Sequence, residues 1–122
     1  MEYKKWFEQA KEDLEKAEIL FKNSKFDGAS FYAQQTAEKS LKAVVLKTKN
    51  KLMKIHDLVV LGMQCDISRD LLEKCKLLSQ VYSASRYGIL DNEIPAKMFF
   101  AEKSKEHIQT AKEVLEWAKK KI

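Results

Sequence analysis

The chain has 122 residues, of which 45% are hydrophobic and 34% charged, with a net charge of +5. This length and composition indicate one globular domain and exclude a disordered chain. No apolar run approaches the ~18 residues of a membrane span, and the start MEYKKW is not a signal peptide. We therefore expect a cytoplasmic protein without a membrane partner.

Cysteine and histidine are too sparse for a disulfide framework or a metal site. The two cysteines lack CxxC spacing and the two histidines are not clustered, so we expect no metal and no cofactor. Cys75 falls on an apolar helix face and is expected to be a small core residue. The positive charge is nearly all lysine, which suits diffuse attraction to phosphate but equally suits a solvated basic surface.

Five helices are predicted in chain order. Three glycines and one proline leave little material for hairpins. Helical spacing of apolar residues predicts the first helix at about residues 2–21 and the second at about 26–49. A short helix follows Asp57 over LVVLGM, and a fourth follows Ser68 as its N-cap. The last opens at Pro95 and runs nearly to the end.

Short connections between long helices predict antiparallel neighbours. The expected fold is all-α: an up-and-down antiparallel bundle of four long helices plus one short helix, forming a single domain over residues 1–122.

The second helix carries polar residues among apolar ones. At ~100° per residue, Gln34 and Glu38 flank the apolar centre, and Gln35, Glu38 and Lys42 form a second row, whereas Lys39 points further out. One interpretation is an ordinary ion pair between Glu38 and Lys42. The other is a half-buried polar site.

Three other helices repeat this pattern. Asp13 projects within the apolar stripe of the first helix, Arg86 runs along the inward face of the fourth, and His107 lies among apolar residues of the last. Because buried charges must be paired, Asp13 or Glu38 should meet Lys42 or Arg86. Such a network could be structural, or with an open face it could hold a phosphate-bearing ligand. His107 itself is expected to be structural, with a lowered pKa.

The segments WFEQAKEDLEKAEIL, FYAQQTAEKSLKAVVL, HDL and SRYG together resemble the HEPN domain (higher eukaryotes and prokaryotes nucleotide-binding) over essentially the whole chain. The most specific part is the QxxEKxxKA core, followed at a distance by His56 and by Arg86-Tyr87. The resemblance implies a homodimer that pairs with a minimal nucleotidyltransferase in a two-gene, toxin–antitoxin-like module, and that binds a nucleotide or RNA.

One departure concerns activity. HEPN ribonucleases carry a histidine four to six residues after an arginine, and neither Arg69 nor Arg86 is followed by one at that spacing. The resemblance therefore favours a binding protein over an enzyme and identifies no catalytic residue. A metal-independent endoribonuclease using Arg86 with a histidine from elsewhere stays open, as does a purely structural partner subunit.

The expected site follows from the resemblance and the helical wheel together. Lys42 and Arg86 would supply positive charge for phosphate, Glu38 and Gln35 would orient them, and Asp13 would support them from behind. The ligand-binding residues expected are Gln35, Glu38, Lys39, Lys42, His56, Arg86 and Tyr87, with Asp13 and Gln34 in support. A dimer is also expected because Phe99 and Trp117 project together, away from the apolar stripe of the last helix.

Overall fold

The computed structural model describes residues 2–87 and 94–122, without the side chains of residues 85–87 and 95. This part of the chain contains helices and no strand, which confirms the all-α prediction. The helices are α1 (Glu2–Lys22), α2 (Phe26–Lys49), α3 (Leu58–Gln64), α4 (Arg69–Tyr87), α5 (Pro95–Met98) and α6 (Ala101–Lys121). None of these helices is long and apolar enough to cross a membrane.

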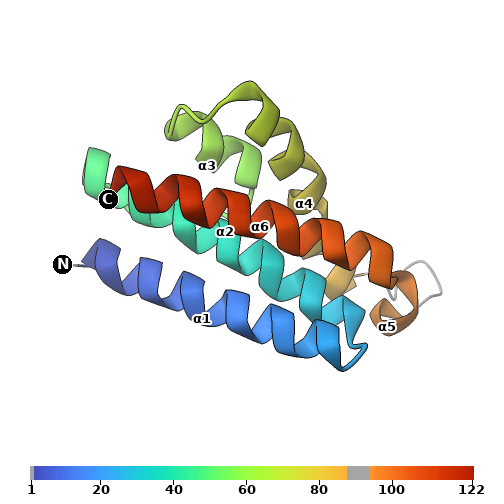
Figure 1. Ribbon diagram of the computed structural model, residues 1–122. Coiled ribbons are helices and arrows are strands. Elements are labelled where there is room, and N and C mark those ends of the chain that lie inside the picture. The colour runs from blue at the N-terminus through green and yellow to red at the C-terminus, as the bar shows by residue number, and fades with distance from the viewer. Residues whose placement is uncertain (1, 88–93) are drawn as a thin grey trace.

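Helix α2 is the centre of the bundle and contacts each of the other five helices. Figure 1 shows α1, α2 and α6 running side by side, with the two chain ends at the same end of the bundle. Helices α3 and α4 lie on the other side of α2 and α6 from α1. Consequently a polar residue on α2 can meet α1 on one side and the α3–α4 segment on the other.

The helix ends are set by local capping. Asp57 accepts a hydrogen bond from the Val59 amide at 2.9 Å, and Ser68 Oγ accepts one from the Leu71 amide at 3.2 Å. Both caps satisfy amides that a helix start leaves free. The cap at Ser68 was predicted, whereas Asp57 was expected in the first turn of its helix and is instead the N-cap. Asn50 follows and caps helix α2, and its left-handed backbone (φ 51°) lets its amide donate to the Leu46 carbonyl.

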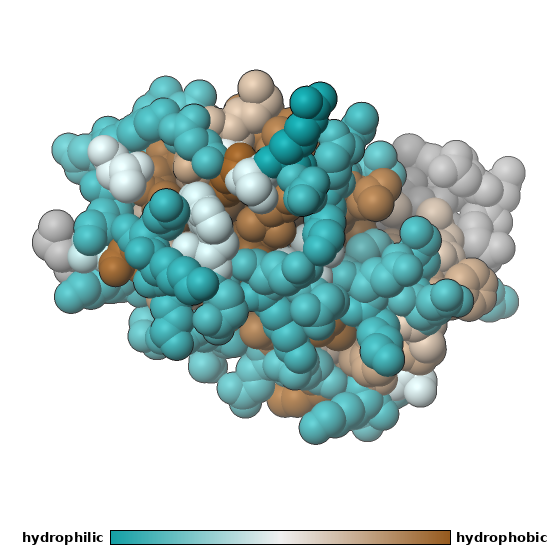
Figure 2. All heavy atoms as spheres, turned by 45° about the horizontal axis from the view of Figure 1, so that its top comes forward, coloured by the Kyte–Doolittle hydropathy of each residue, from teal (hydrophilic) through white to brown (hydrophobic). Residues whose placement is uncertain are grey.

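Small residues bring the helices close together in the core. Ala29, Ala33 and Ala37 of α2 are fully buried, and larger side chains such as Leu41 fill the remaining space. Cys75 is also fully buried, and burial raises the pKa of its thiol to about 12, in agreement with a core role. Figure 2 shows that hydrophilic side chains cover most of one outer face, with apolar groups reaching the surface between them.

The start of the last helix differs from the prediction. Pro95 opens the separate one-turn helix α5, and the chain is extended at Phe99 and Phe100 before α6 begins. Because successive side chains of an extended chain point to opposite sides, Phe99 is buried (8% exposed) and Phe100 is exposed (69%). Phe99 packs edge-on to His107 in the core, with ring centroids 6.5 Å apart. The prediction that Phe99 and Trp117 form an aromatic surface together is therefore wrong.

Candidate functional site

One buried ion pair joins α1 to α2. The carboxylate of Asp13 is 1% exposed and accepts hydrogen bonds from Lys39 and, at 3.0 Å, from Gln9. Asp13 thus pairs with Lys39, whereas the predicted partner Lys42 pairs with Glu38 instead. The helical wheel directs Lys39 further out, yet its side chain is only 20% exposed because it folds back over Asp13.

A second polar cluster surrounds Glu38, which is 3% exposed. Its two carboxylate oxygens accept from Lys42 Nζ at 2.9 Å, from Gln34 Nε2 at 3.2 Å and contact His56 Nδ1 at 3.0 and 3.1 Å. Gln35 donates in turn to the Gln34 side-chain oxygen at 2.8 Å. The structure therefore brings five of the predicted site residues together and confirms the pairing of Glu38 with Lys42.

The ammonium group of Lys42 lies inside this cluster and not on its surface. Lys42 is 5% exposed, and its Nζ lies 5.4 Å from the centre of the Trp6 ring. A cation over an indole face is stabilised by the ring quadrupole. In this arrangement the positive charge of Lys42 is directed at Glu38 and covered by Trp6.

His56 is the member of the Glu38 cluster that is most exposed to solvent. Its side chain is 51% exposed, and its ring stacks on Tyr82 of α4 with centroids 4.3 Å apart and planes 13° apart. Gln34 Nε2 also donates to the His56 carbonyl at 3.2 Å, so both the backbone and the ring are held. An ionised carboxylate only accepts hydrogen bonds, so the Nδ1 that faces Glu38 carries a proton. The other ring nitrogen, Nε2, is then left for solvent or a ligand.

Arg86 and Tyr87 belong to the last turn of α4, but their side chains lie outside the described residues. Arg86 follows Tyr82 by four positions, which places its backbone about one helical turn further along α4. The predicted roles of Arg86 and Tyr87 therefore stay predictions.

A separate chain of hydrogen bonds holds His107. Ser104 Oγ donates to the Phe26 carbonyl at 2.9 Å and lies 2.7 Å from Ser30 Oγ, which lies 2.8 Å from His107 Nδ1. Because the Ser104 proton is used, Ser30 donates to Ser104 and His107 Nδ1 donates to Ser30. Burial, reinforced by the nearby Lys103, lowers the pKa of His107. The lowered pKa of His107 agrees with the prediction. Nothing in the sequence distinguishes Ser30 and Ser104 from serines on a helix surface.

The hollows of the surface lie elsewhere. Four hollows of the described part of the chain lie between α1 and α6, between α4 and α6, and near the chain ends, and Glu38 and His56 line none of these four. The candidate site is therefore defined by its buried and paired charged groups and not by one of these hollows. Within the described residues no group of histidine, cysteine and carboxylate side chains could hold a metal ion.

Comparison with known proteins identifies the fold and the family. Residues 3–122 match the HEPN domain. The chain belongs to the HEPN domain family. A crystal structure of TT1696 from Thermus thermophilus is similar with a TM-score of 0.90 at 26% identity, over 98% of both chains. The structure of ST0689, described as an archaeal HEPN homologue, is similar with a TM-score of 0.79 at 26% identity, over 96% of this chain and 94% of that one. No curated protein matches the chain.

Proposed function

We propose that this HEPN-family chain binds a phosphate-containing ligand, either a nucleotide or RNA, on the surface that His56 forms beside α4. The observation that carries the proposal is a half-exposed imidazole held by a buried carboxylate. Burying the charges of Glu38 and Lys42 costs free energy, and a cluster needed only for packing could use apolar groups instead. An oriented ring nitrogen at the surface gives this arrangement a use in binding.

The charge available to a ligand comes from few groups. Lys42 and Lys39 are both engaged with carboxylates, so they set the position of Glu38 and of α1 rather than meeting solvent. We propose that His56 is the direct contact, that Arg86 and Tyr87 extend the same surface along α4, and that Gln35 borders it. Asp13 and Gln34 do not contact the ligand but hold Lys39 and Glu38 in place through hydrogen bonds.

We further propose that the chain works as a homodimer and as the partner of a minimal nucleotidyltransferase, in a two-gene module of the toxin–antitoxin kind. This rests on membership of the HEPN family. Co-expression with the protein of an adjacent gene, followed by light scattering of the purified product, tests both statements. A monomer that forms no complex with a neighbouring nucleotidyltransferase contradicts them.

Binding is tested by calorimetric titration of the protein with ATP and with a short single-stranded RNA. His56→Ala should weaken binding about tenfold or more, since hydrogen bonds to a charged ligand contribute about 1.5–3 kcal/mol. His107→Gln is the matched control, because it changes the only other histidine and leaves the site intact. If both variants bind as the parent does, the cluster is structural and the proposal fails.

A second candidate function is metal-independent endoribonuclease activity. It is favoured by one observation, which is that His56 packs on α4, the helix that carries Arg86, although the sequence lacks the usual spacing. With Nδ1 held by Glu38, the other ring nitrogen is oriented as a general base for an RNA 2′-hydroxyl. Incubating the purified protein with RNA, beside His56→Ala and Arg86→Ala, tests this function. Cleavage that persists in both variants excludes this pair as its source.

A further inference from the structure

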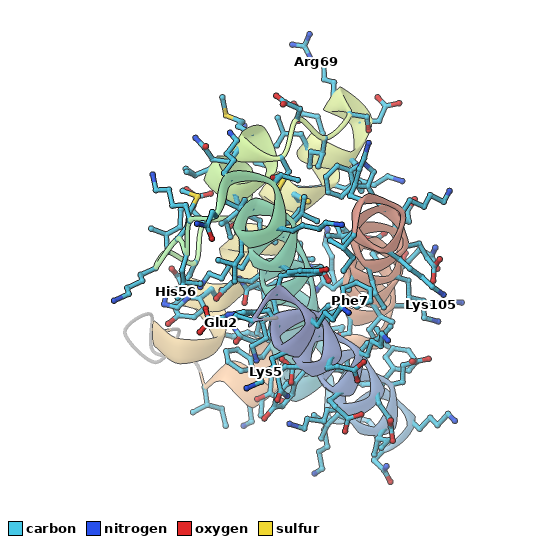
Figure 3. The ribbon with its side chains drawn as sticks, turned by 90° about the vertical axis from the view of Figure 1, so that its left-hand side faces the viewer. Glu2, Lys5, Phe7, His56, Arg69 and Lys105 are labelled. Atoms are coloured by element: carbon cyan, nitrogen blue, oxygen red, sulfur yellow. The ribbon has the colours of Figure 1, made fainter. Side chains whose placement is uncertain are left out.

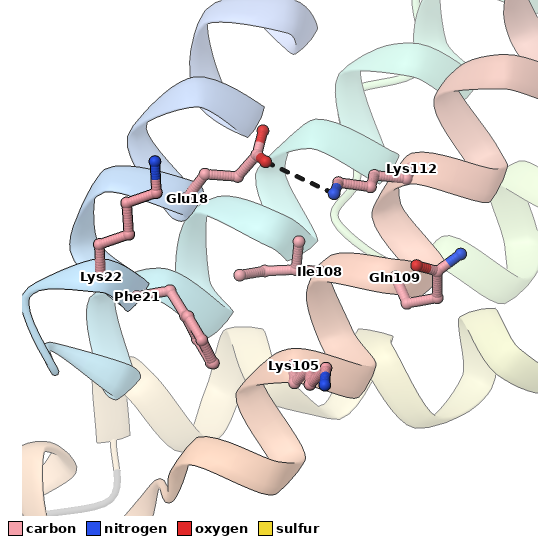
Figure 4. A pocket seen from close by; sticks show the side chains of 7 residues that line it. All are labelled: Glu18, Phe21, Lys22, Lys105, Ile108, Gln109 and Lys112. Carbon is pink, nitrogen blue, oxygen red and sulfur yellow. Dashed lines mark ion pairs between the residues drawn. The ribbon is translucent and has the colours of Figure 1, made fainter.

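A shallow groove between α1 and α6 combines an apolar floor with a basic rim. Phe21 and Ile108 project into it from opposite sides, and Lys22, Lys105 and Lys112 surround them (Figure 4). Glu18 is the one carboxylate of the lining and is paired with Lys112 at 3.4 Å. Three lysines against one glutamate leave the groove with a net positive charge.

The two remaining lysines are available to a partner. Lys22 and Lys105 are exposed, and neither forms an ion pair with any residue that the structure describes. The apolar floor itself is formed by Phe21 of α1 and Ile108 of α6. An apolar hollow beside unpaired charges of one sign is typical of an interaction surface.

The size of the groove limits what can occupy it. Its volume of about 220 Å³ is below the ~300–1,000 Å³ typical of small-molecule sites, but it can accept one aliphatic side chain. The groove lies between helices α1 and α6, which run side by side. Lys105 and Lys112 of α6 are seven residues apart, or about 10.5 Å along the helix. A helix laid along the seam presents the same face at the same interval.

We propose that this groove binds an acidic amphipathic helix of a protein partner, with one leucine-sized side chain on the apolar floor and carboxylates facing Lys22 and Lys105. Helices commonly bind through such anchors laid into a groove. Charge complementarity supplies orientation and the rate of encounter, and the apolar anchor supplies affinity. The proposal is independent of the ligand surface proposed above: the groove shares no residue with it, and Lys105 and His56 lie on opposite sides of the bundle (Figure 3).

The test uses the full chain and two fluorescent peptides of identical composition, each about 20 residues long so that it can be helical. The first carries leucines every seven residues on one line with glutamates on both flanks, and the second has the same residues scrambled. Anisotropy titrations should show binding of the first peptide at micromolar concentration, weakening as salt is raised. The scrambled peptide should bind at least about tenfold more weakly, because it lacks an aligned anchor.

Variants locate the binding on the molecule. Lys22→Glu combined with Lys105→Glu should weaken the first peptide about tenfold, since each exposed contact is small and the two reversals act together. Lys76→Glu is the matched control, because it reverses an exposed lysine of α4 and should leave binding unchanged. All substituted residues are exposed, so circular dichroism should show unchanged folding.

In the peptide titrations, three results overturn the proposal. They are no binding of the first peptide below ~1 mM, equal binding of both peptides, and binding that the double reversal does not change. A single-stranded oligouridine included in the same titrations distinguishes the competing source of negative charge. If the oligonucleotide binds more tightly than the peptide and loses binding in the double reversal, the groove is a nucleic-acid surface and the proposal is wrong.

Discussion

Replacing Lys42 by methionine isolates the contribution of one buried charge. Methionine keeps most of the apolar stem beneath Trp6 but removes the ammonium group 2.9 Å from Glu38. Removing one partner of a buried pair costs about 3–5 kcal/mol, because the other charge stays buried without compensation. Glu38 retains its contacts with Gln34 and His56, so we expect the lower limit, about 3 kcal/mol.

Urea unfolding followed by circular dichroism measures this loss directly, and thermal unfolding should show a decrease of roughly 10 °C for a domain of this size. Lys47→Met is the control on the same helix. Lys47 is exposed, and its replacement should change stability by less than about 0.5 kcal/mol.

The double variant Glu38→Gln with Lys42→Met provides the decisive comparison. It removes both charges while keeping side chains of similar shape, so it should cost less than the sum of the single variants by about 1–3 kcal/mol. If Lys42→Met costs under about 1 kcal/mol, or if the two substitutions are additive, Lys42 and Glu38 do not stabilise the fold through their mutual interaction. The reasoning that assigns Lys42 to Glu38 would then be refuted.

Three further predictions concern other parts of the bundle. Because the pKa of His107 is lowered on folding, the unfolded chain binds more protons below the usual ~6.5, so stability should fall as pH drops from there towards the folded value. Urea titrations from pH 7 to 5 should show this loss, and His107→Gln should reduce its slope. Gly62→Ala should destabilise by about 1–3 kcal/mol, because the new Cβ would lie 2.7 Å from Ile67 Cδ1 and 3.0 Å from Leu72 Cδ1, so two packed side chains must shift. Gly28→Ala meets Leu20 alone, at 3.0 Å, and should be near neutral by thermal unfolding. Asp57→Ala should cost about 1 kcal/mol in urea unfolding through loss of the α3 cap.

The sequence predicted helix positions well where capping and turn residues mark them. Helix α2 has the predicted limits, and Asp57 and Ser68 cap the helices that they precede. The break at Phe99 and Phe100 was missed because neither residue is a turn former, and no side chain caps the start of α6. Apolar periodicity alone cannot tell a continued helix from two helices joined by an extended pair.

The candidate site was predicted in its composition more closely than in its pairing. A helical wheel gives the direction of Cβ and correctly placed Glu38 and Lys42 near the core. It cannot show where a lysine nitrogen ends, because four methylene groups let Lys39 reach Asp13 from the flank of α2. The stacking of His56 on Tyr82 joins segments separated by 26 residues, and such contacts depend on the tertiary arrangement.

The two buried ion pairs of α2 differ in what they reach. Asp13 and Lys39 tie α1 to α2. Among the described residues the carboxylate of Asp13 otherwise meets Gln9 and the half-exposed Lys16, whose Nζ lies 3.7 Å away. That pair fixes the alignment of two helices.

The Glu38 pair is different, because its carboxylate also holds an imidazole at the surface. A pair that only aligned helices would gain nothing from a half-exposed ring whose orientation is fixed at both its Nδ1 atom and its backbone carbonyl. The asymmetry between two otherwise similar pairs on one helix is therefore the reason to look for ligand binding at His56 rather than at Asp13. Paired measurements on Asp13→Asn and Glu38→Gln should show lost stability in both but weakened ligand binding only in the second.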